Sequence, residues 1–152
     1  MLFRSVVSSS RRRASPSLLY AVKQVELAVR AHLDDLLKPA GVTALQFTAL
    51  TVLERRDDLT AAALARNSFV TTQSMADLVA ALHRRGLVER FRDPDDGRRI
   101  LIHLTDAGRA LIDEQRPAVE ALEKRMLDGL GASEVEVVRD ALNRMRQNLE
   151  AG

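Results

Sequence analysis

The sequence predicts a mainly α-helical protein that carries one small β-hairpin. Apolar residues recur at steps of three and four over most of the 152 residues, which is the spacing of amphipathic helices. One short segment, residues 99–104, alternates with a two-residue period instead, which indicates a strand. Aromatic residues make up only 3% of the chain and Trp is absent, a composition that suits helices packed through Leu, Val and Ala.

The composition also limits the function. The chain has no cysteine, which excludes disulfides, thiolate metal sites and cysteine catalysis. Apolar residues make up 46% and charged residues 29%, with a formal net charge of +2, so a basic surface for a partner must come from local clustering. No apolar run is long enough to cross a membrane. We therefore expect a cytoplasmic protein with no membrane partner.

Residues 1–16 form a distinct basic segment. They contain four arginines and five serines but no acid. A secretory signal would need a longer apolar core after its basic run, so we interpret the segment as an N-terminal tail. We expect it to be either a mobile or loosely docked tail or a basic arm that touches phosphate groups.

Two amphipathic helices are predicted next. The first covers residues 17–38, with an apolar stripe that begins at Leu18, and Pro39 and Gly41 end it. Thr43 and Gln46 form a capping box at the start of the second. The apolar residues of that second helix are Leu45, Ala49, Leu50 and Leu53.

A pair of helices and a hairpin follow the polar break at residues 55–58. Thr60 is predicted to cap a short helix over 61–66, and a longer helix runs from Thr72 to about Arg85 and ends at Gly86. Residues 87–91 and 99–104 are predicted strands. The link between them, Asp93-Pro94-Asp95-Asp96-Gly97, is rich in residues that favour turns.

Two helices are predicted at the C-terminal end. Thr105 caps a long helix that reaches about Leu127, and Pro117 inside it predicts a kink or a break. Ser133 and Glu136 match a second capping box. The helix behind it reaches about residue 149 and has one apolar stripe.

This order of elements is that of a winged helix-turn-helix domain, here residues 43–104. In such domains the second helix of the pair lies in the major groove of double-stranded DNA, and the hairpin, or wing, reaches toward the backbone and the adjacent minor groove. The flanking segments 17–38 and 105–152 carry apolar stripes that this domain cannot cover. We therefore expect double-stranded DNA as a partner and a homodimer built through the flanking helices.

The candidate DNA contacts lie at the start of the second helix and at the wing tip. Hydroxyls and N–H groups at a helix N-terminus bind phosphate, and Gln can read adenine through two hydrogen bonds. Arginines of the wing can meet phosphates, and Asp96 is close enough to Arg98 in sequence to pair with it across the turn. A solvated hairpin of balanced charge is the alternative for the wing, and capping is a second role for Thr71. The candidate residues are Thr71, Thr72, Gln73, Ser74, Asp77, Asp96, Arg98 and Arg99.

The segment from Leu59 to Ile112 resembles the MarR family of regulators. Its strongest match, "DPDDGRRILIHLTDAGR", fits the family's wing signature: an Asp-Pro pair, then Asp-x-Arg, then a strand that ends in Leu-Thr-x-x-Gly. The resemblance implies that Asp96 and Arg98 form the wing pair, with Arg98 directed to the minor groove. It also implies recognition-helix positions for residues 72–74, and homodimers held by the N- and C-terminal helices.

Asp77 departs from the family's pattern, because many members carry a basic or polar residue at that recognition-helix position. An acid there would repel phosphates, accept a hydrogen bond from cytosine N4, or pair with a nearby arginine. The basic N-terminal segment is a further departure.

The resemblance also implies a small effector, an aromatic acid or another lipophilic molecule, bound between the dimer helices and the winged-helix domain. By placement, His32, Phe47 and Arg92 are candidates for that cleft. Ordinary packing and surface positions are the alternative for each.

We therefore expect a sequence-specific, DNA-binding transcriptional regulator, a ligand-responsive repressor that binds an inverted-repeat operator. The alternative is a winged-helix dimer that acts as a protein-interaction module without specific DNA binding. No nucleophile motif, phosphate loop or His-Glu-x-x-His signature occurs in the sequence, and the three histidines are far apart in it. We expect no catalytic site, no cofactor and no metal.

Overall fold

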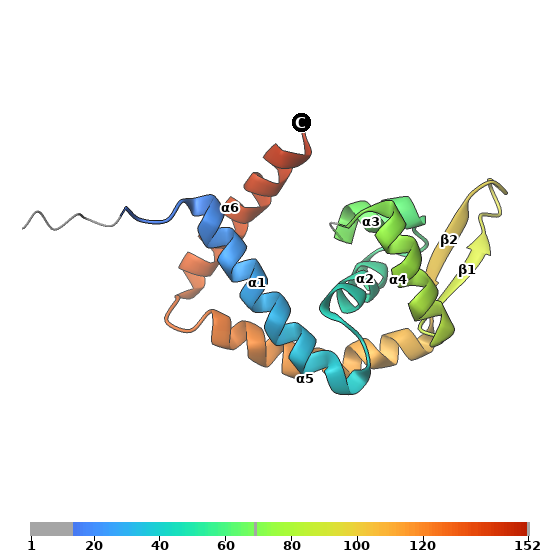
Figure 1. Ribbon diagram of the computed structural model, residues 1–152, viewed down its shortest axis with the longest axis horizontal. Helices are drawn as coiled ribbons and strands as arrows, with labels where there is room; N and C mark the ends of the chain where they lie inside the picture. The colour runs from blue at the N-terminus through green and yellow to red at the C-terminus, as the bar shows by residue number, and fades with distance from the viewer. Residues whose placement is uncertain (1–13, 69, 152) are drawn as a thin grey trace, which may run out of the picture.

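The computed structural model describes residues 14–68 and 70–151 (Figure 1). Its elements over these residues are α1 (Leu18–Leu37), the 3-10 helix η1 (Lys38–Ala40), α2 (Ala44–Arg55), α3 (Ala61–Ser68), α4 (Thr72–Arg84), β1 (Val88–Arg92), β2 (Ile100–Leu104), α5 (Asp106–Met126) and α6 (Ala132–Glu150). The prediction of a mainly α-helical fold with one hairpin is confirmed. Most of the predicted basic tail, including Arg11, Arg12 and Arg13, lies outside the described residues.

Side-chain caps set most of the helix starts as the sequence predicts. Thr43 Oγ1 accepts from the N–H of Gln46 at 3.1 Å, and the Gln46 side chain accepts from the N–H of Thr43 at 3.0 Å. Both halves of that capping box are therefore present. Thr60 Oγ1 accepts from the N–H of Ala63 at 3.2 Å. The short helix behind it runs two residues beyond the predicted end, to Ser68.

One prediction for the C-terminal helices is wrong, and one alternative of another is excluded. The helix cap is not Ser133: α6 begins at Ala132 with Gly131 as its N-cap, and the Glu134 side chain accepts from the N–H of Gly131 at 3.0 Å. The Glu134 side chain caps the first turn without Ser133, so α6 starts two residues before the start that a Ser133 cap predicts. At Pro117 a kink or a break was expected, and the break does not occur, because α5 runs continuously through this residue.

The hydrophobic core belongs to the middle of the chain. Among residues 14–68 and 70–151, every buried apolar residue lies between Leu37 and Ile112. The largest side chains that are almost fully buried come from α1 to α5 and from both strands, but not from η1: Leu37, Leu50, Leu53, Leu64, Met75, Leu82, Val88, Ile102, Leu104 and Ile112. A helix that contributes nothing to this core needs another surface to cover its apolar face.

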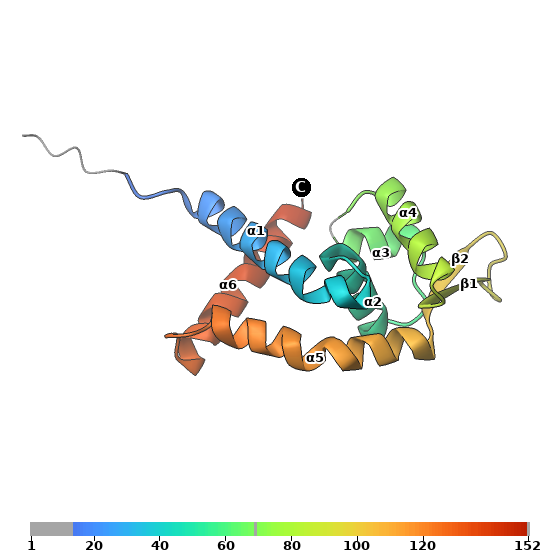
Figure 2. The same cartoon turned by 60° about the horizontal axis from the view of Figure 1, so that its bottom comes forward.

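The terminal helices lie on one side of this core. α1 and α5 pack against each other, and α5 connects the winged-helix domain (residues 43–104) to α6, as the two views show (Figures 1 and 2). Within the described residues, no single helix is both long and apolar enough to span a bilayer. The segments Leu18–Ala40 and Ala44–Arg55 are long and apolar enough only when taken together, and they are bent by 82° at their break.

Candidate nucleic-acid interface

The start of α4 presents polar side chains to solvent. Thr71 is the N-cap, and its Oγ1 accepts from the N–H of Ser74 at 3.1 Å and donates to the Ser74 hydroxyl at 2.9 Å. These two hydroxyls are therefore engaged with each other. Thr72 and Gln73 are also exposed. Because the opposite face of α4 buries Met75, Val79 and Leu82, these polar residues are held outward.

Asp77 lies one turn after Gln73 on the same exposed face of α4. Within the described residues, its carboxylate forms no ion pair and no hydrogen bond. The expected option of pairing with a nearby arginine is therefore not realised there. Gln73 and Asp77 together offer an amide and a carboxylate along one line of the helix, and both groups remain free for base edges.

The wing is an antiparallel hairpin that is bridged to the chain before α3. β1 and β2 are antiparallel with Phe91 opposite Leu101, and each begins one residue later than predicted. The N–H of Ile102 donates to the carbonyl of Leu59 at 2.8 Å, so the chain before α3 forms an isolated β-bridge with β2.

Beside that bridge, Nδ1 of His103 lies 3.0 Å from Oδ1 of Asp58. Asp58 has a left-handed backbone, with φ of 58°. A non-glycine residue adopts this conformation at a cost, and here it brings the Asp58 carboxylate to the wing. Asp58 and His103 thus tie the loop after α2 to β2, a link that the sequence analysis missed.

The aspartates of the wing tip bind backbone amides. Asp93 accepts from the N–H of Asp95 at 2.9 Å, and Asp96 accepts from the N–H of Arg98 at 3.1 Å. Asp96 and Arg98 do not form the predicted side-chain pair: the carboxylate closes a local turn and uses the amide of Arg98. The nearest ion pair at the tip joins Arg99 to Asp93 at 3.9 Å. The exposed Arg98 guanidinium has no hydrogen bond or ion pair within the described part of the chain.

The Leu-Thr-x-x-Gly segment joins the wing to α5. Thr105 Oγ1 accepts from the N–H of Gly108 at 3.1 Å and donates to the carbonyl of Gly86 at 2.7 Å. A Cβ on Gly108 would collide with the carbonyl oxygen of Leu87 and with the Leu104 side chain. This contact requires glycine at position 108. It explains why a glycine follows Thr105 by three residues in the Leu-Thr-x-x-Gly segment.

A second link fixes the winged-helix domain to α5. Arg116 donates to Asp113 at 3.1 Å and to Glu54 of α2 at 3.1 Å. These hydrogen bonds, first to Asp113 and then to Glu54, raise the pKa of Arg116 above its ordinary value, because the carboxylates favour the charged form. At the other end of the domain, Arg85 donates to the carbonyls of Gly41 and Ala40 at 2.7 and 2.9 Å. Neither arginine was singled out from the sequence.

The three candidate ligand residues are not brought together. Phe47 is buried in the core, and Arg92 donates to the carbonyl of Gly97 at the wing tip, 3.1 Å away. Only His32 lines a hollow, of about 420 Å³, between α1 and α5, with Val29, Val119 and Met126 among its neighbours. The three candidate residues therefore do not line one common hollow in this structure, and their role in effector binding stays a prediction.

Known proteins share this arrangement. The MarR family profile matches residues 40–99. An HTH-type transcriptional repressor of Mycobacterium tuberculosis is 33% identical over 113 residues, which cover 74% of this chain and 81% of the relative. The chain belongs to the MarR family of transcriptional regulators. An uncharacterised HTH-type regulator of Bacillus subtilis is 30% identical over 109 residues, which cover 72% of this chain and 66% of that relative.

Solved structures of the MarR fold agree in layout. CouR from Rhodococcus jostii, bound to p-coumaroyl-CoA, superimposes with a TM-score of 0.80 at 26% identity, covering 89% of this chain and 95% of CouR. A mutant MarR from E. coli, complexed with operator DNA, gives a TM-score of 0.76 at 26% identity, covering 84% and 92%. The predicted family and fold are confirmed, whereas the role of each candidate residue in DNA or ligand binding stays a prediction.

Proposed function

We propose that this MarR-family regulator binds an inverted-repeat operator as a homodimer, with α4 in the major groove and the wing over the flanking minor groove. The observation that carries the proposal is the Arg98 guanidinium, which has no partner among residues 14–68 and 70–151, at the tip of a wing that lies against α4. The acids at the tip fold the turn and leave Arg98 available. Arginine inserted into a narrow minor groove is a common form of recognition.

The terminal helices support the homodimer. α6 has no buried residue, and most of its large apolar side chains are exposed, as are those along the outer part of α1. Leu19 is 73% exposed and Val137 is 68% exposed. Contiguous apolar surface of this kind marks an interface. A second copy of this chain, related by a two-fold axis, can cover the exposed apolar faces of α1 and α6, because each copy presents the same two faces.

In this proposal the protein binds operator DNA and releases it when an effector binds. CouR, whose fold this chain shares, is bound to p-coumaroyl-CoA in its structure, and a small acidic effector of this chain would act by changing the spacing of the two α4 helices. We assign no catalytic step to the chain. A bacterial regulator of this kind acts in the cytoplasm, where the DNA is.

The test is a gel shift with genomic fragments from the source organism, measured across salt concentrations. A specific regulator retains a small set of fragments at salt concentrations that release the rest, because non-specific binding falls steeply as salt rises. Equal loss of all fragments, or no retention, would support the alternative of a protein-interaction module instead.

A further inference from the structure

The wing extends well beyond its buried base. Val88 and Ile102 at the base are buried, whereas Ile100, nearer the tip, is exposed, and the turn projects away from the helices (Figures 1 and 2). The chain from His103 to Arg98 covers up to about 16 Å, at about 3.3 Å per residue. A tilt of about 10° at the base therefore moves the tip by about 3 Å. A shift of this size breaks a hydrogen bond.

The base of the wing is held by two consecutive residues of the loop between α2 and α3. The carbonyl of Leu59 accepts from the N–H of Ile102 at 2.8 Å, and Oδ1 of Asp58 lies 3.0 Å from Nδ1 of His103. The His103 ring also meets the Phe91 ring in an edge contact, with centroids 6.3 Å apart. Side chains from both strands of the wing and from the loop therefore meet at His103.

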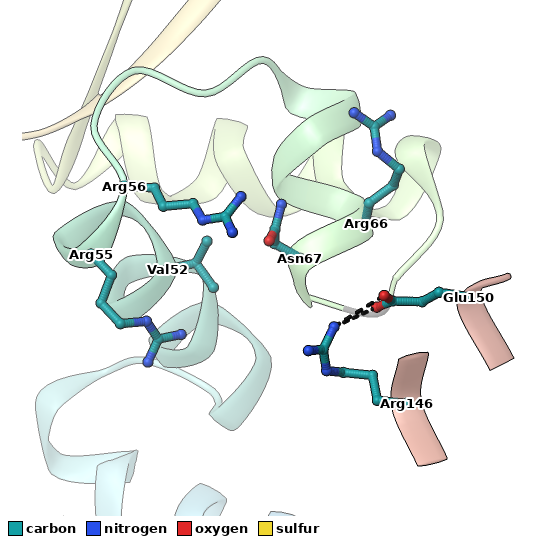
Figure 3. A pocket seen from close by; sticks show the side chains of 7 residues that line it. All are labelled: Val52, Arg55, Arg56, Arg66, Asn67, Arg146 and Glu150. Atoms are coloured by element: carbon teal, nitrogen blue, oxygen red, sulfur yellow. Dashed lines mark hydrogen bonds and ion pairs between the residues drawn. The ribbon is translucent and has the colours of Figure 1, made fainter. Parts of the chain in front are cut away.

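The Asp58 carboxylate reaches the wing although two cations are nearer in sequence. Arg55 and Arg56 directly precede Asp57 and Asp58, but both line a separate hollow of about 730 Å³ beside α3 and α6 (Figure 3). Over the ranges that the structure describes, Asp58 pairs with His103 and with neither arginine. The direction of this carboxylate is therefore set by the fold of the loop and not by the closest positive charge.

The contact is poorly explained as a source of stability. The side chains of His103 and Asp58 are 40% and 43% exposed, and an ion pair this exposed contributes little. The left-handed backbone of Asp58, with φ of 58°, works against that small gain. Strained backbone of this kind is often found where the placement of a residue serves function.

We propose that Asp58, acting through His103, is a positioning residue for the wing. It holds β2 at the angle at which Arg98 reaches the flanking minor groove, and it does not itself contact DNA. The inference rests on the proposed function, in which Arg98 makes that contact, and adds the residue that fixes its reach.

The test compares variants of the full chain on an operator fragment that the parent retains. Asp58→Gly keeps the left-handed backbone without strain and removes the carboxylate. His103→Phe keeps a ring against Phe91 and removes the nitrogen that meets Asp58. Each should weaken binding about fivefold, and the double variant no further, because both remove one contact. The control Asp57→Gly removes the same charge one residue earlier, where it lies 3.7 Å from Arg109 of α5, and should bind like the parent.

A second measurement separates positioning from a general structural role. If Asp58 acts through Arg98, adding Asp58→Gly to Arg98→Ala causes no further loss of affinity. Asp58→Gly alone should also lose the parent's preference for A·T-rich over G·C-rich flanks, because that preference comes from an arginine in a narrow groove. Melting temperatures establish that the variants are folded. If Asp58→Gly melts below the parent, His103→Phe with and without Arg98→Ala carries the same test.

Four results would overturn the inference. Parental affinity in both Asp58→Gly and His103→Phe, with a loss in Arg98→Ala, would refute it and leave the proposed function standing. An equal loss in Asp57→Gly would assign the effect to the loop as a whole. A loss in His103→Phe without one in Asp58→Gly would make His103 a DNA contact. Parental affinity in Arg98→Ala would refute both this inference and the proposed role of the wing.

Discussion

The carbonyl oxygen of Leu87 lies so close to Gly108 that a Cβ on residue 108 would overlap it. This contact seats the first turn of α5 against the chain that enters β1. We expect Gly108→Ala to lower the free energy of unfolding by about 3 kcal/mol, because forced overpacking of a buried site costs roughly 1–3 kcal/mol and backbone cannot move aside as a flexible side chain can.

Gly97→Ala is the matched control for this substitution. Gly97 is at the exposed wing tip, and a Cβ there meets no atom within 4 Å. Its effect on the free energy of unfolding should stay within about 0.5 kcal/mol. Urea denaturation of both variants decides the matter, and similar midpoints for the two would show that the tight contact at Gly108 is not required.

Arg98→Ala should weaken operator binding about tenfold or more while the fold stays intact. The reason is its exposed guanidinium, which has no partner within the described residues and is free for phosphate or a minor groove. A hydrogen bond to a charged group is worth about 1.5–3 kcal/mol, which corresponds to about tenfold or more in affinity. The measurements are gel-shift affinity and melting temperature.

Lys38→Ala is the control for Arg98→Ala, because it removes one positive charge from η1, outside the proposed interface. If both variants lose affinity equally, the loss reflects net charge, and the specific role of Arg98 is wrong.

Local sequence patterns predicted most of the fold, because helix periodicity and caps act over a few residues. Thr43, Thr60 and Thr105 were all placed correctly as caps. The last cap was wrong because Gly131 and Ser133 can both precede a helix that has an acid three residues later, and only the structure distinguishes Glu134 from Glu136 as the acid used.

The sequence predicted the hairpin of the wing correctly, but the predicted side-chain pair of Asp96 and Arg98 was wrong for a similar reason. A carboxylate two residues before Arg98 can reach either the guanidinium or the backbone amide, and the turn geometry selects the amide. The bridge from Leu59 to Ile102 and the Asp58–His103 contact join segments more than 40 residues apart. No local pattern carries that information.

Gln73→Ala should relax sequence preference more than it lowers non-specific affinity. A good bidentate contact to a base contributes about 1–3 kcal/mol of discrimination. Selection from a randomised operator library tests this. Recovery of the parent's consensus sequence by the variant would count against base reading by Gln73.

Asp77→Asn should raise affinity for unrelated DNA, because it removes an exposed negative charge that is unpaired within the described residues of the interface. If Asp77 accepts from cytosine N4, the same variant also loses preference for cytosine at one position of each half-site. Fluorescence anisotropy on operator and random duplexes measures both effects. Unchanged affinity for the random duplex would mean that Asp77 does not face the DNA.

Disrupting the apolar face of α6 should dissociate the dimer. Val138 and Leu142, four residues apart, are 44% and 46% exposed, and burial against a partner is their role in the proposed dimer. We expect Val138→Glu with Leu142→Glu, or truncation after Gly131, to give monomer or aggregate in analytical ultracentrifugation. Ser133→Glu adds an acid to the first turn of the same helix, where it suits the helix dipole, and should leave the dimer intact. A well-folded dimer of the double variant would refute this interface.

The form of the operator follows from the two-fold symmetry of such a dimer. The two α4 helices, each starting at Thr72, are related by the same axis, so they read the same sequence in opposite directions and the site is an inverted repeat. Half-site centres should lie about 10–10.5 bp apart, because both helices must reach one face of the duplex. The two Arg98 side chains then lie over the flanking minor grooves. A·T-rich flanks should strengthen binding, since their narrow grooves concentrate negative potential.

Changing the spacing of the half-sites tests whether the dimer is rigid. Inserting five base pairs rotates one half-site by about half a turn and should abolish tight binding. Inserting a full turn, about 10.5 bp, restores the face but moves the half-sites farther apart, so a dimer whose α4 helices are fixed through α5 and α6 should regain little affinity. DNase footprinting on the parent and both spaced operators distinguishes the cases. Equal protection at every spacing would mean that the half-sites are bound independently and that the α4 helices are not held at a fixed distance.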